Sequence, residues 1–393
     1  MLTLAKTAQY NNYIMIENIL DRIEQRLSNG RAKIVLCSLG WGNQTEIFSR
    51  IEKLVKAHHP NVEFFAEDTI DVFKKKVLSK SSDKYYCLFL REIFERRDFT
   101  VLINLAYGKN NVLLFGTSSF HPIVIDYNRM TTIAGRYESY YLAAHSFAEI
   151  HKLMEGIDFQ TYLHKGGLLF DDRDDCFKKT LSKIEEELSS RKVQELRDFF
   201  DFLIHHSGEN WSERELSLSV NGALSPNTIG KYLDTYVNRF LLYRLECFDF
   251  NRMKTVRNKF RFYPYDTSMY SYSKNECVQK IDLLSITPLI GRAKEEGFDC
   301  FFGYFHQKRT DSAGVRRYRD EHVGIYVTDG ERSMVFQLNV SGTSEVSENL
   351  RRVPIWIDKY VVEYGSKKTA LDKKGIYHVG IEYLLGNDFI WRK

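Results

Sequence analysis

A loop with two glycines, SLGWGNQTE (38–46), joins a short apolar run to an amphipathic stretch. The apolar run, KIVLCSL (33–39), is typical of a buried parallel strand, and IFSRIEKLVKAHH (47–59) has helical apolar spacing. A strand, a glycine-bearing loop and a helix in this order open a nucleotide-binding βα unit. Such a loop binds phosphates when backbone N–H groups wrap around them, a Lys reaches the β/γ-phosphates, and a Ser or Thr holds Mg²⁺.

The loop keeps only part of that chemistry. On the Walker A template, Gln44 stands at the Lys position and Thr45 at the hydroxyl position. They follow Gly40, Gly42 and Asn43. Gln is neutral, so it does not balance the charge that accumulates on a transferring γ-phosphoryl group. One interpretation is a weak ATP site, and the other is a plain strand-to-helix turn whose glycines serve backbone geometry.

A second apolar run, YYCLFL (85–90), ends in Arg91-Glu92. In the Walker B motif such a run ends in Asp-Glu, where the Asp holds the metal through water and the Glu orients the attacking water. An Arg at the metal-side position repels Mg²⁺, so we expect no Mg²⁺ here. Arg91 would instead pair with Glu92 or with a phosphate. If the chain does hydrolyse ATP, Glu92 is the candidate catalytic residue.

Two further apolar runs, VEFFAE (62–67) and NVLLFG (111–116), continue the pattern, with helical segments between the runs. Strands alternating with helices predict an α/β domain with a doubly wound, mostly parallel sheet.

From about residue 175 the pattern changes to three helical segments followed by a hairpin, the order of a winged helix-turn-helix. Ser225 is a predicted helix N-cap with Pro in the first turn. The helix that starts there would be the recognition helix and would expose Asn227, Lys231 and Asp234.

The hairpin carries the strongest basic signal, NRMKTVRNKFRF (251–262), which contains no acid. Basic residues interleaved with Phe and Met suit phosphate contacts along a duplex. The candidates for contact with nucleic acid are therefore Lys231, Arg252, Lys254, Arg257 and Lys259. The alternative is a solvated wing whose charges bind nothing. Another basic segment, HQKRTDSAGVRRYRDEH (306–322), is interpreted as a loop.

Past Pro264 the pattern is mixed, with a helix expected at about 285–296 and strands at 300–305, 322–329 and 333–340. An Asp-Gly pair within 328–331 predicts a hairpin turn.

The composition is that of an ordinary globular protein, with 43% hydrophobic and 27% charged residues. The net charge of +4 is too small to indicate nucleic acid by itself.

No signal peptide and no apolar stretch long enough for a membrane span is visible, so we expect a cytoplasmic protein without a membrane partner. The six dispersed cysteines are expected to be reduced thiols. The His pairs at 58–59 and 205–206 lack zinc spacing, so no metal site is predicted.

Several segments, in order and over most of the chain, resemble a bacterial and archaeal AAA-type ATPase family. They are NVLLFGTSSF (111–120), IAGRYESYYLAAHSFAEIHKL (133–153), YLHKGGLLF (162–170), SPNTIGKYLDTYVNRFLLYRL (225–245) and KFRFYPYDTSMYS (259–271). Members of that family have an AAA domain, a winged helix and a C-terminal domain of restriction-endonuclease-like fold. The resemblance implies that Ser118 belongs to a sensor-like turn and that Arg136 lies near the nucleotide or a neighbouring subunit. An ion pair of Arg136 with Glu138 or Glu149 is the alternative.

The chain departs from the family at its charged motifs. Besides Gln44 and Arg91, Gly324 stands at the Asp position of the family's nuclease-like metal site and Asn339 at its Lys position, while Gln337 is kept. Carboxylates hold the metal and the Lys stabilises developing charge in such sites.

We therefore predict an α/β protein of three domains: an AAA-type P-loop-like domain (1–172), a helical linker with a winged helix (173–265), and a restriction-endonuclease-like domain (266–393). The leading hypothesis is a degenerate ATPase-like module that binds DNA or protein and retains at most weak ATP binding. The first alternative is an active ATPase that uses non-standard residues or residues from another subunit. The second is a regulatory interaction protein that needs no nucleotide. A homo-oligomer is compatible with each.

Overall fold

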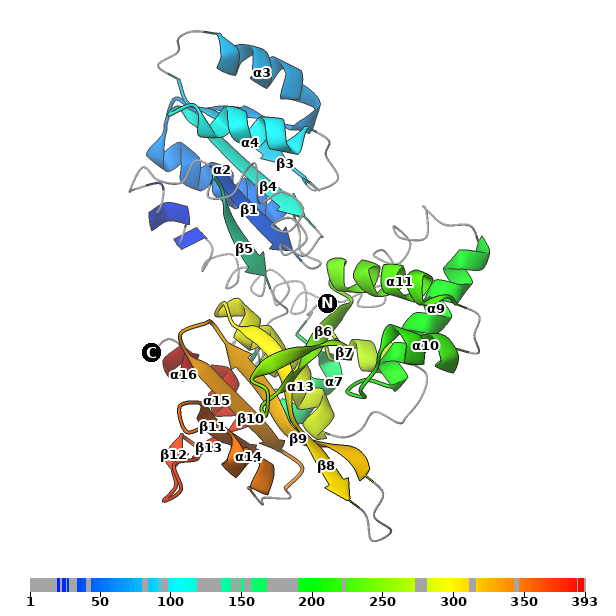
Figure 1. Cartoon of the computed structure of the whole chain (residues 1–393). Helices are drawn as coiled ribbons and strands as arrows, with labels where there is room; N and C mark the ends of the chain where they lie inside the picture. The colour runs from blue at the N-terminus through cyan, green and yellow to red at the C-terminus, as the bar shows by residue number, and fades with distance from the viewer. Residues whose placement is uncertain are drawn as a thin grey trace. The chain divides into compact units, whose positions relative to one another are not determined.

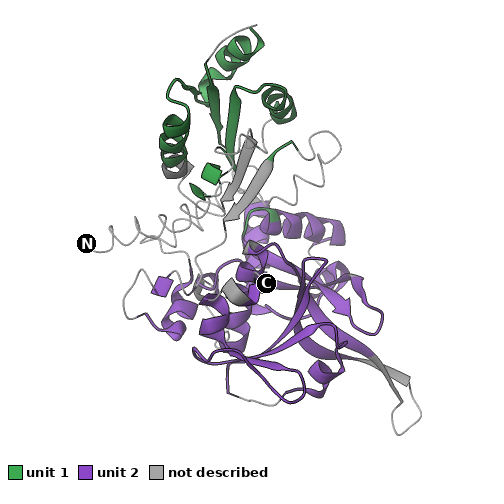
Figure 2. Cartoon of the chain, turned by 90° about the vertical axis from the view of Figure 1, so that its left-hand side faces the viewer, with its two compact units in different colours: residues 1–143, 238–240 green, residues 144–237, 241–393 purple. Residues whose placement is uncertain are grey.

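The computed structural model describes two compact units, residues 1–143 with 238–240 and residues 144–237 with 241–393, coloured separately in Figure 2. The described residues are 20–21, 23–25, 27, 34–39, 44–79, 84–91, 93, 98–118, 136–142, 147, 150–151, 157–167, 190–220, 224–272, 281–310, 316–342, 346–386 and 388–391. The backbone alone is described at 34–39, 44–47, 138–142, 190–191, 257, 271–272, 295, 307–310, 316–319 and 388–389. The predicted division into three domains stays a prediction.

The first unit is built on a five-stranded parallel sheet in the order β2-β3-β4-β1-β5 (Figure 1). Its strands are β1 (Ile34–Leu39), β2 (Glu63–Phe65), β3 (Tyr86–Leu90), β4 (Val112–Ser118) and β5 (Glu138–Leu142). The four predicted apolar runs are the first four strands. The parallel α/β sheet is thus confirmed, because strands buried on both faces are continuously apolar.

Helices cover both faces of this sheet. They are α2 (Gln44–His58), α3 (Ile70–Leu78) and α4 (Phe99–Tyr107), with a 3₁₀ turn, η1 (Glu67–Thr69), before α3. Alternate residues of β3 separate the two layers: Leu88 packs with Phe73 and Phe99 of α3 and α4, whereas Cys87 packs with Phe48 of α2. The period of two along each strand therefore gives two separate cores, as a doubly wound sheet requires.

The second unit begins with helices α7 (Phe159–Lys165), α9 (Ser190–His205), α10 (Glu213–Ser219) and α11 (Pro226–Asn238). The hairpin of β6 (Leu242–Asp249) and β7 (Lys254–Pro264) follows, and then α12 (Met269–Tyr272). The predicted order of three helices and a hairpin is confirmed.

The hairpin continues into an eight-stranded sheet, in the order β12-β13-β11-β10-β9-β8-β6-β7. The remaining strands are β8 (Asp299–Thr310), β9 (Arg316–Thr328), β10 (Ser333–Asn339), β11 (Asp358–Glu363), β12 (Ala370–Leu371) and β13 (Tyr377–Gly380). Helices α13 (Ile281–Glu295), α14 (Glu348–Arg352), α15 (Ile381–Gly386) and α16 (Asp388–Trp391) complete the unit. Strand β6 pairs in parallel with β8 on one side and with β7 on the other. Strand β7 is therefore the last strand of the order, and the basic hairpin forms an edge of this sheet.

The predicted turn at Asp329-Gly330 is confirmed: it joins β9 to β10, and Gly330 has a φ of 92°. The interpretation of 306–322 as a loop is wrong, because β8 continues to Thr310 and β9 begins at Arg316. Val315 and Tyr318 are the only large apolar residues of the segment, so it lacks the apolar alternation by which strands are recognised.

Candidate nucleic-acid interface

The carboxyl ends of β1, β3 and β4 share one edge of the parallel sheet. Ser118, the last residue of β4, is buried, and Arg91 directly follows β3. The backbone N–H of Arg91 donates to Glu67 Oε1 at 2.7 Å. Glu67 opens the turn after β2, so a carboxylate that the sequence analysis did not single out lies at the same edge. The neighbouring Thr117 Oγ1 is buried and has no hydrogen-bond partner among the described residues.

The other predicted nucleotide-binding positions are described less fully. Gln44 and Thr45 are the first two residues of α2, and their backbone alone is described. Gly40, Gly42, Asn43 and Glu92 lie outside the described residues. The role of all these residues stays a prediction.

Arg136 is not brought together with Arg91 and Ser118. It precedes β5, whose first residue Glu138 pairs with Val35 near the start of β1, whereas Ser118 pairs with Ser38 near its end. Val35 and Ser38 are three residues apart, so at about 3.3 Å per residue these levels are separated by roughly 10 Å along the strands, and Arg136 lies two residues further from Ser118 than Glu138 does. Its guanidinium donates to Asn104 Oδ1 of α4. Arg136 therefore lies at the amino edge of the sheet.

The predicted recognition helix, α11, begins as expected. Ser225 Oγ accepts a hydrogen bond from the N–H of Thr228 at 3.2 Å, which is the N-cap contact. Asn227, Lys231 and Asp234 are exposed, and this part of the prediction is confirmed. Contact of Lys231 with nucleic acid stays a prediction.

The turn of the β6–β7 hairpin carries two of the predicted cations. The side chain of Arg252 is 61% exposed and lies 3.6 Å from the Asp249 carboxylate. Lys254, the first residue of β7, is exposed. Arg257 lies in β7, where its backbone alone is described.

A large bulge interrupts the hairpin. Cys247 pairs with Val256 but Glu246 pairs with Phe260, so residues 257–259 have no opposing residue on β6. Asn258, at the centre of the bulge, has a φ of 62°, a conformation that Asn tolerates better than most residues. Bulges redirect side chains next to functional sites.

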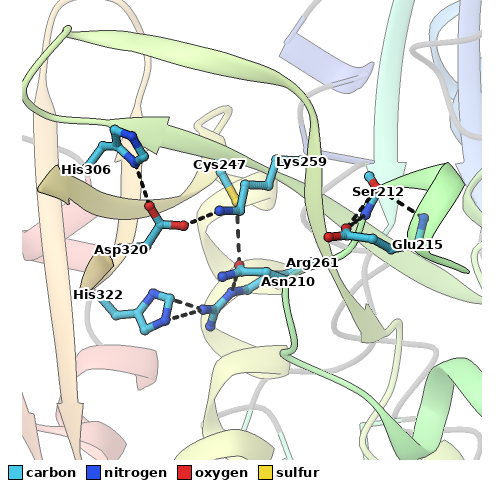
Figure 3. Close-up of polar contacts among 9 residues, drawn as sticks. All are labelled: Asn210, Ser212, Glu215, Cys247, Lys259, Arg261, His306, Asp320 and His322. Atoms are coloured by element: carbon cyan, nitrogen blue, oxygen red, sulfur yellow. Dashed lines mark hydrogen bonds and ion pairs between the residues drawn. The ribbon is translucent and has the colours of Figure 1, made fainter. Parts of the chain in front are cut away.

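Lys259, in the bulge, forms an ion pair with Asp320 of β9, and His306 Nδ1 lies 2.8 Å from the other carboxylate oxygen (Figure 3). Burial alone would raise the pKa of Asp320, but the hydrogen bonds from Lys259 and His306 hold it below its ordinary value. The basic run contains no acid in its own sequence, yet the fold brings one to it. The positive charge of Lys259 is therefore largely neutralised.

Arg261, two residues on, keeps its charge. Its Nε donates to Asn210 Oδ1 at 2.7 Å, and its Nη2 lies 3.1 Å from His322 Nδ1 (Figure 3). Its guanidinium carbon lies 3.2 Å from the centre of the Phe302 ring. Partial burial, and then the charge of Arg261, lowers the pKa of His322 to about 4, so His322 is neutral at pH 7. Within the described residues, no carboxylate lies within ion-pair distance of Arg261. A cation held rigidly by neutral partners is suited to bind phosphate.

The segment KFRFYPYDTSMYS has a structural role that the sequence did not reveal. Asp266 is buried, and its carboxylate accepts from the N–H of Gly167 at 2.7 Å and from the N–H of Ser268 at 2.9 Å. Gly166 has a φ of 76°, and a Cβ there would lie 1.9 Å from Asp266 Oδ1. Two segments of the family resemblance, 162–170 and 259–271, thus meet at this carboxylate.

The predicted remnants of a metal site are packed closed. Gly324 has a φ of 155°, and a Cβ there would lie 2.1 Å from the carbonyl oxygen of Phe336. Gln337 Nε2 donates to Asn339 Oδ1 at 2.9 Å, and both side chains are buried. An Asp at position 324 would require β10 to move.

The described residues lack two kinds of feature. They contain no group of three or more His, Cys, Asp or Glu side chains that could hold a metal ion. They also contain no helix both long and apolar enough to span a bilayer.

Residues 176–276 match the model of a family described as a domain of unknown function, DUF8612. The matched segment includes α9, α10, α11 and the β6–β7 hairpin. No curated protein matches the chain.

Two solved structures are similar to the chain. One is from the structure of Drosophila ORC bound to AT-rich DNA and Cdc6, with 11% identity, a TM-score of 0.26, and coverage of 69% of this chain and 96% of that chain. The other is the Aeropyrum pernix ORC1 protein in complex with DNA, with 11% identity, a TM-score of 0.28, and coverage of 70% and 93%. Both TM-scores are too low to support an inference about this chain.

Proposed function

We propose that this chain is a catalytically degenerate AAA-type ATPase-like protein that binds duplex DNA through the α9–α11 helices and the β6–β7 hairpin. The observation that best supports the proposal is Arg261, a cation on β7 whose hydrogen-bond partners within the described residues are neutral. Phosphate contacts from such cations supply most of the sequence-independent affinity for DNA.

Two further features support a winged-helix role for this region. The three helices and the hairpin follow in winged-helix order, and α11 exposes Lys231 beside a Ser225 N-cap. The hairpin turn adds the exposed Arg252 and Lys254. We include in the same proposal that the remaining strands have a restriction-endonuclease-like origin. The proposal assigns them no metal chemistry, because the backbone at Gly324 leaves no room for a carboxylate side chain.

Degeneracy is proposed from Arg91. It stands directly after β3, where Walker B carries the metal-side carboxylate, and a guanidinium does not coordinate Mg²⁺. ATP, if bound, would thus be held weakly and without metal at the edge that Arg91 shares with Ser118. A thermal shift with ATP tests this, because a ligand at 100 times its dissociation constant stabilises by about 2.7 kcal/mol. A shift that requires Mg²⁺, with turnover that Glu92→Gln abolishes, would instead establish the active ATPase.

Duplex binding is tested by fluorescence anisotropy with the full chain at several salt concentrations. The double variant Arg252→Gln/Lys254→Gln should bind more weakly, and the slope of log K against log salt should decrease by about 1.8, at ~0.9 per phosphate contact. The matched control is Lys373→Gln/Lys374→Gln, which removes the same charge from exposed positions near β12–β13. Equal loss in both double variants would mean that only net charge matters, and absence of duplex binding would refute the proposal.

A further inference from the structure

The longest hairpin of the chain, β8–β9, extends beyond the sheet. Strand β8 pairs with β6 as far as Tyr304, and β9 pairs with β10 only from Ile325 onward. The pairs from Phe305–Glu321 to Thr310–Arg316 join β8 and β9 to each other alone among the described ladders, and the two strands run on together in Figure 1. We call this two-stranded segment, residues 305–310 and 316–321, the basic arm.

The composition of the basic arm differs from that of the rest of the fold. Between residues 307 and 319 the chain has five basic residues and one acidic residue, Asp311, a net charge of +4. The basic residues are Lys308, Arg309, Arg316, Arg317 and Arg319. Tyr318 and Val315 are the only large apolar residues, so neither strand has an apolar face to bury. Hydrophobic packing therefore does not explain why the hairpin is so long.

Like charges also oppose each other in the arm. Arg309 and Arg317 occupy paired backbone positions of the ladder. Like charges at paired positions of an antiparallel ladder are destabilising, and a bound polyanion compensates for them.

The acidic residues at the base of the arm are already neutralised. Asp320 pairs with Lys259 and His306, and Glu321 Oε2 accepts from Arg352 Nη1 at 2.9 Å. The base is also attached to the proposed hairpin interface, because Asn251 Nδ2 donates to the carbonyl of His306 at 2.7 Å. The basic arm is thus continuous with the β6–β7 hairpin.

From these observations we infer that the basic arm is a second DNA-binding element, which enters a groove of the duplex beside the β6–β7 hairpin. Its six residue pairs span about 20 Å at ~3.3 Å per residue. The major groove of B-DNA, about 12 Å wide, admits a two-stranded ribbon. The inference rests on the proposed function and adds a separate element and mode of contact to it.

The test uses the full chain and the variant Lys308→Gln/Arg309→Gln/Arg317→Gln. At 0.15 M salt, loss of three phosphate contacts should weaken duplex binding on the order of 100-fold and reduce the salt slope by about 2.7. The control Lys368→Gln/Lys373→Gln/Lys374→Gln removes equal charge from exposed positions and should change affinity far less. The melting temperature of the arm variant should not fall, since the variant removes like charges from the paired positions 309 and 317 of the ladder.

Each outcome decides between the two ideas. If the Arg252/Lys254 variant loses binding while the arm variant behaves like its control, the proposed function stands and the inference about the arm is overturned. A wild-type chain that binds single strands or phosphatidylserine vesicles in preference to the duplex overturns both. Selective loss of duplex binding in the arm variant supports the inference.

Discussion

Removal of the Asp266 carboxylate should destabilise the second unit strongly. In Asp266→Ala, the buried N–H of Gly167 and the half-buried N–H of Ser268 lose their acceptor. An unsatisfied buried donor costs about 1–3 kcal/mol, so two of them give an expected loss of about 3 kcal/mol. With an m-value of about 2 kcal/mol per molar urea, the unfolding midpoint should fall by about 1.5 M.

Urea unfolding of the full chain, followed by tryptophan fluorescence, measures this shift, because the second unit contains Trp211, Trp356 and Trp391. The control is Asp299→Ala at an exposed position, which should remain within about 0.5 kcal/mol of wild type. A loss below about 1 kcal/mol for Asp266→Ala would refute the reasoning, since the two N–H groups would then have found other partners.

A double-mutant cycle with Gly166→Ala tests the geometry itself. The added Cβ lies 1.9 Å from Asp266 Oδ1, so the single change should disrupt the carboxylate contact and strain the positive φ. In the Asp266→Ala background the clash with the carboxylate disappears, whereas the 2.9 Å approach to Ser268 Cβ and the φ strain, about 1 kcal/mol, remain. The double variant should therefore lose less than the sum of the two single changes.

Three other predictions concern the eight-stranded sheet. Gly324→Ala should lower the melting temperature much more than Gly330→Ala, because both have positive φ but only position 324 has backbone in the way of a Cβ. The pKa of His322 is lowered to about 4 in the folded chain, so as the pH falls the unfolded chain takes up the His322 proton at a higher pH than the folded chain. Stability should thus decline from about pH 6.5 to pH 4, and His322→Gln should flatten that decline in urea titrations. Asp320→Asn should release the charge of Lys259, so duplex affinity should rise and the salt slope should steepen by about 0.9, measured by anisotropy; unchanged binding would mean that Lys259 does not contact phosphate.

Much of the fold was predictable because its signals are local. The four apolar runs of the first unit became strands since a parallel strand is buried on both faces and must be apolar throughout. The Ser225 cap and the exposed face of α11 followed from helix geometry alone. The Asp329-Gly330 turn followed from the need for positive φ at its glycine.

The sequence predicted which basic residues the candidate site contains, but not which of them are neutralised by a carboxylate. The basic run at 251–262 was visible, but which cation keeps its charge depends on β9, which lies about 60 residues further along the chain: Asp320 neutralises Lys259 and the neutral His322 supports Arg261. Arg136 was grouped with Arg91, yet the direction of the parallel strands puts it at the opposite edge.

By itself, the sequence determined the α/β class and the order of the elements, because both follow from the spacing of apolar residues over short stretches. It also showed that position 44 is not Lys and position 91 is not Asp, because these depend on residue type alone. Only the tertiary structure decided that the β6–β7 hairpin is a sheet edge, that residues 305–310 and 316–321 form a two-stranded arm, and that Asp266 joins two distant segments. The first and the third depend on pairing between residues more than fifty positions apart, and the arm depends on ladder pairs six to sixteen positions apart. Local propensity does not specify such pairings. A backbone N–H or C=O group can pair with any exposed strand edge or carboxylate, and only the folded chain determines which partner it has.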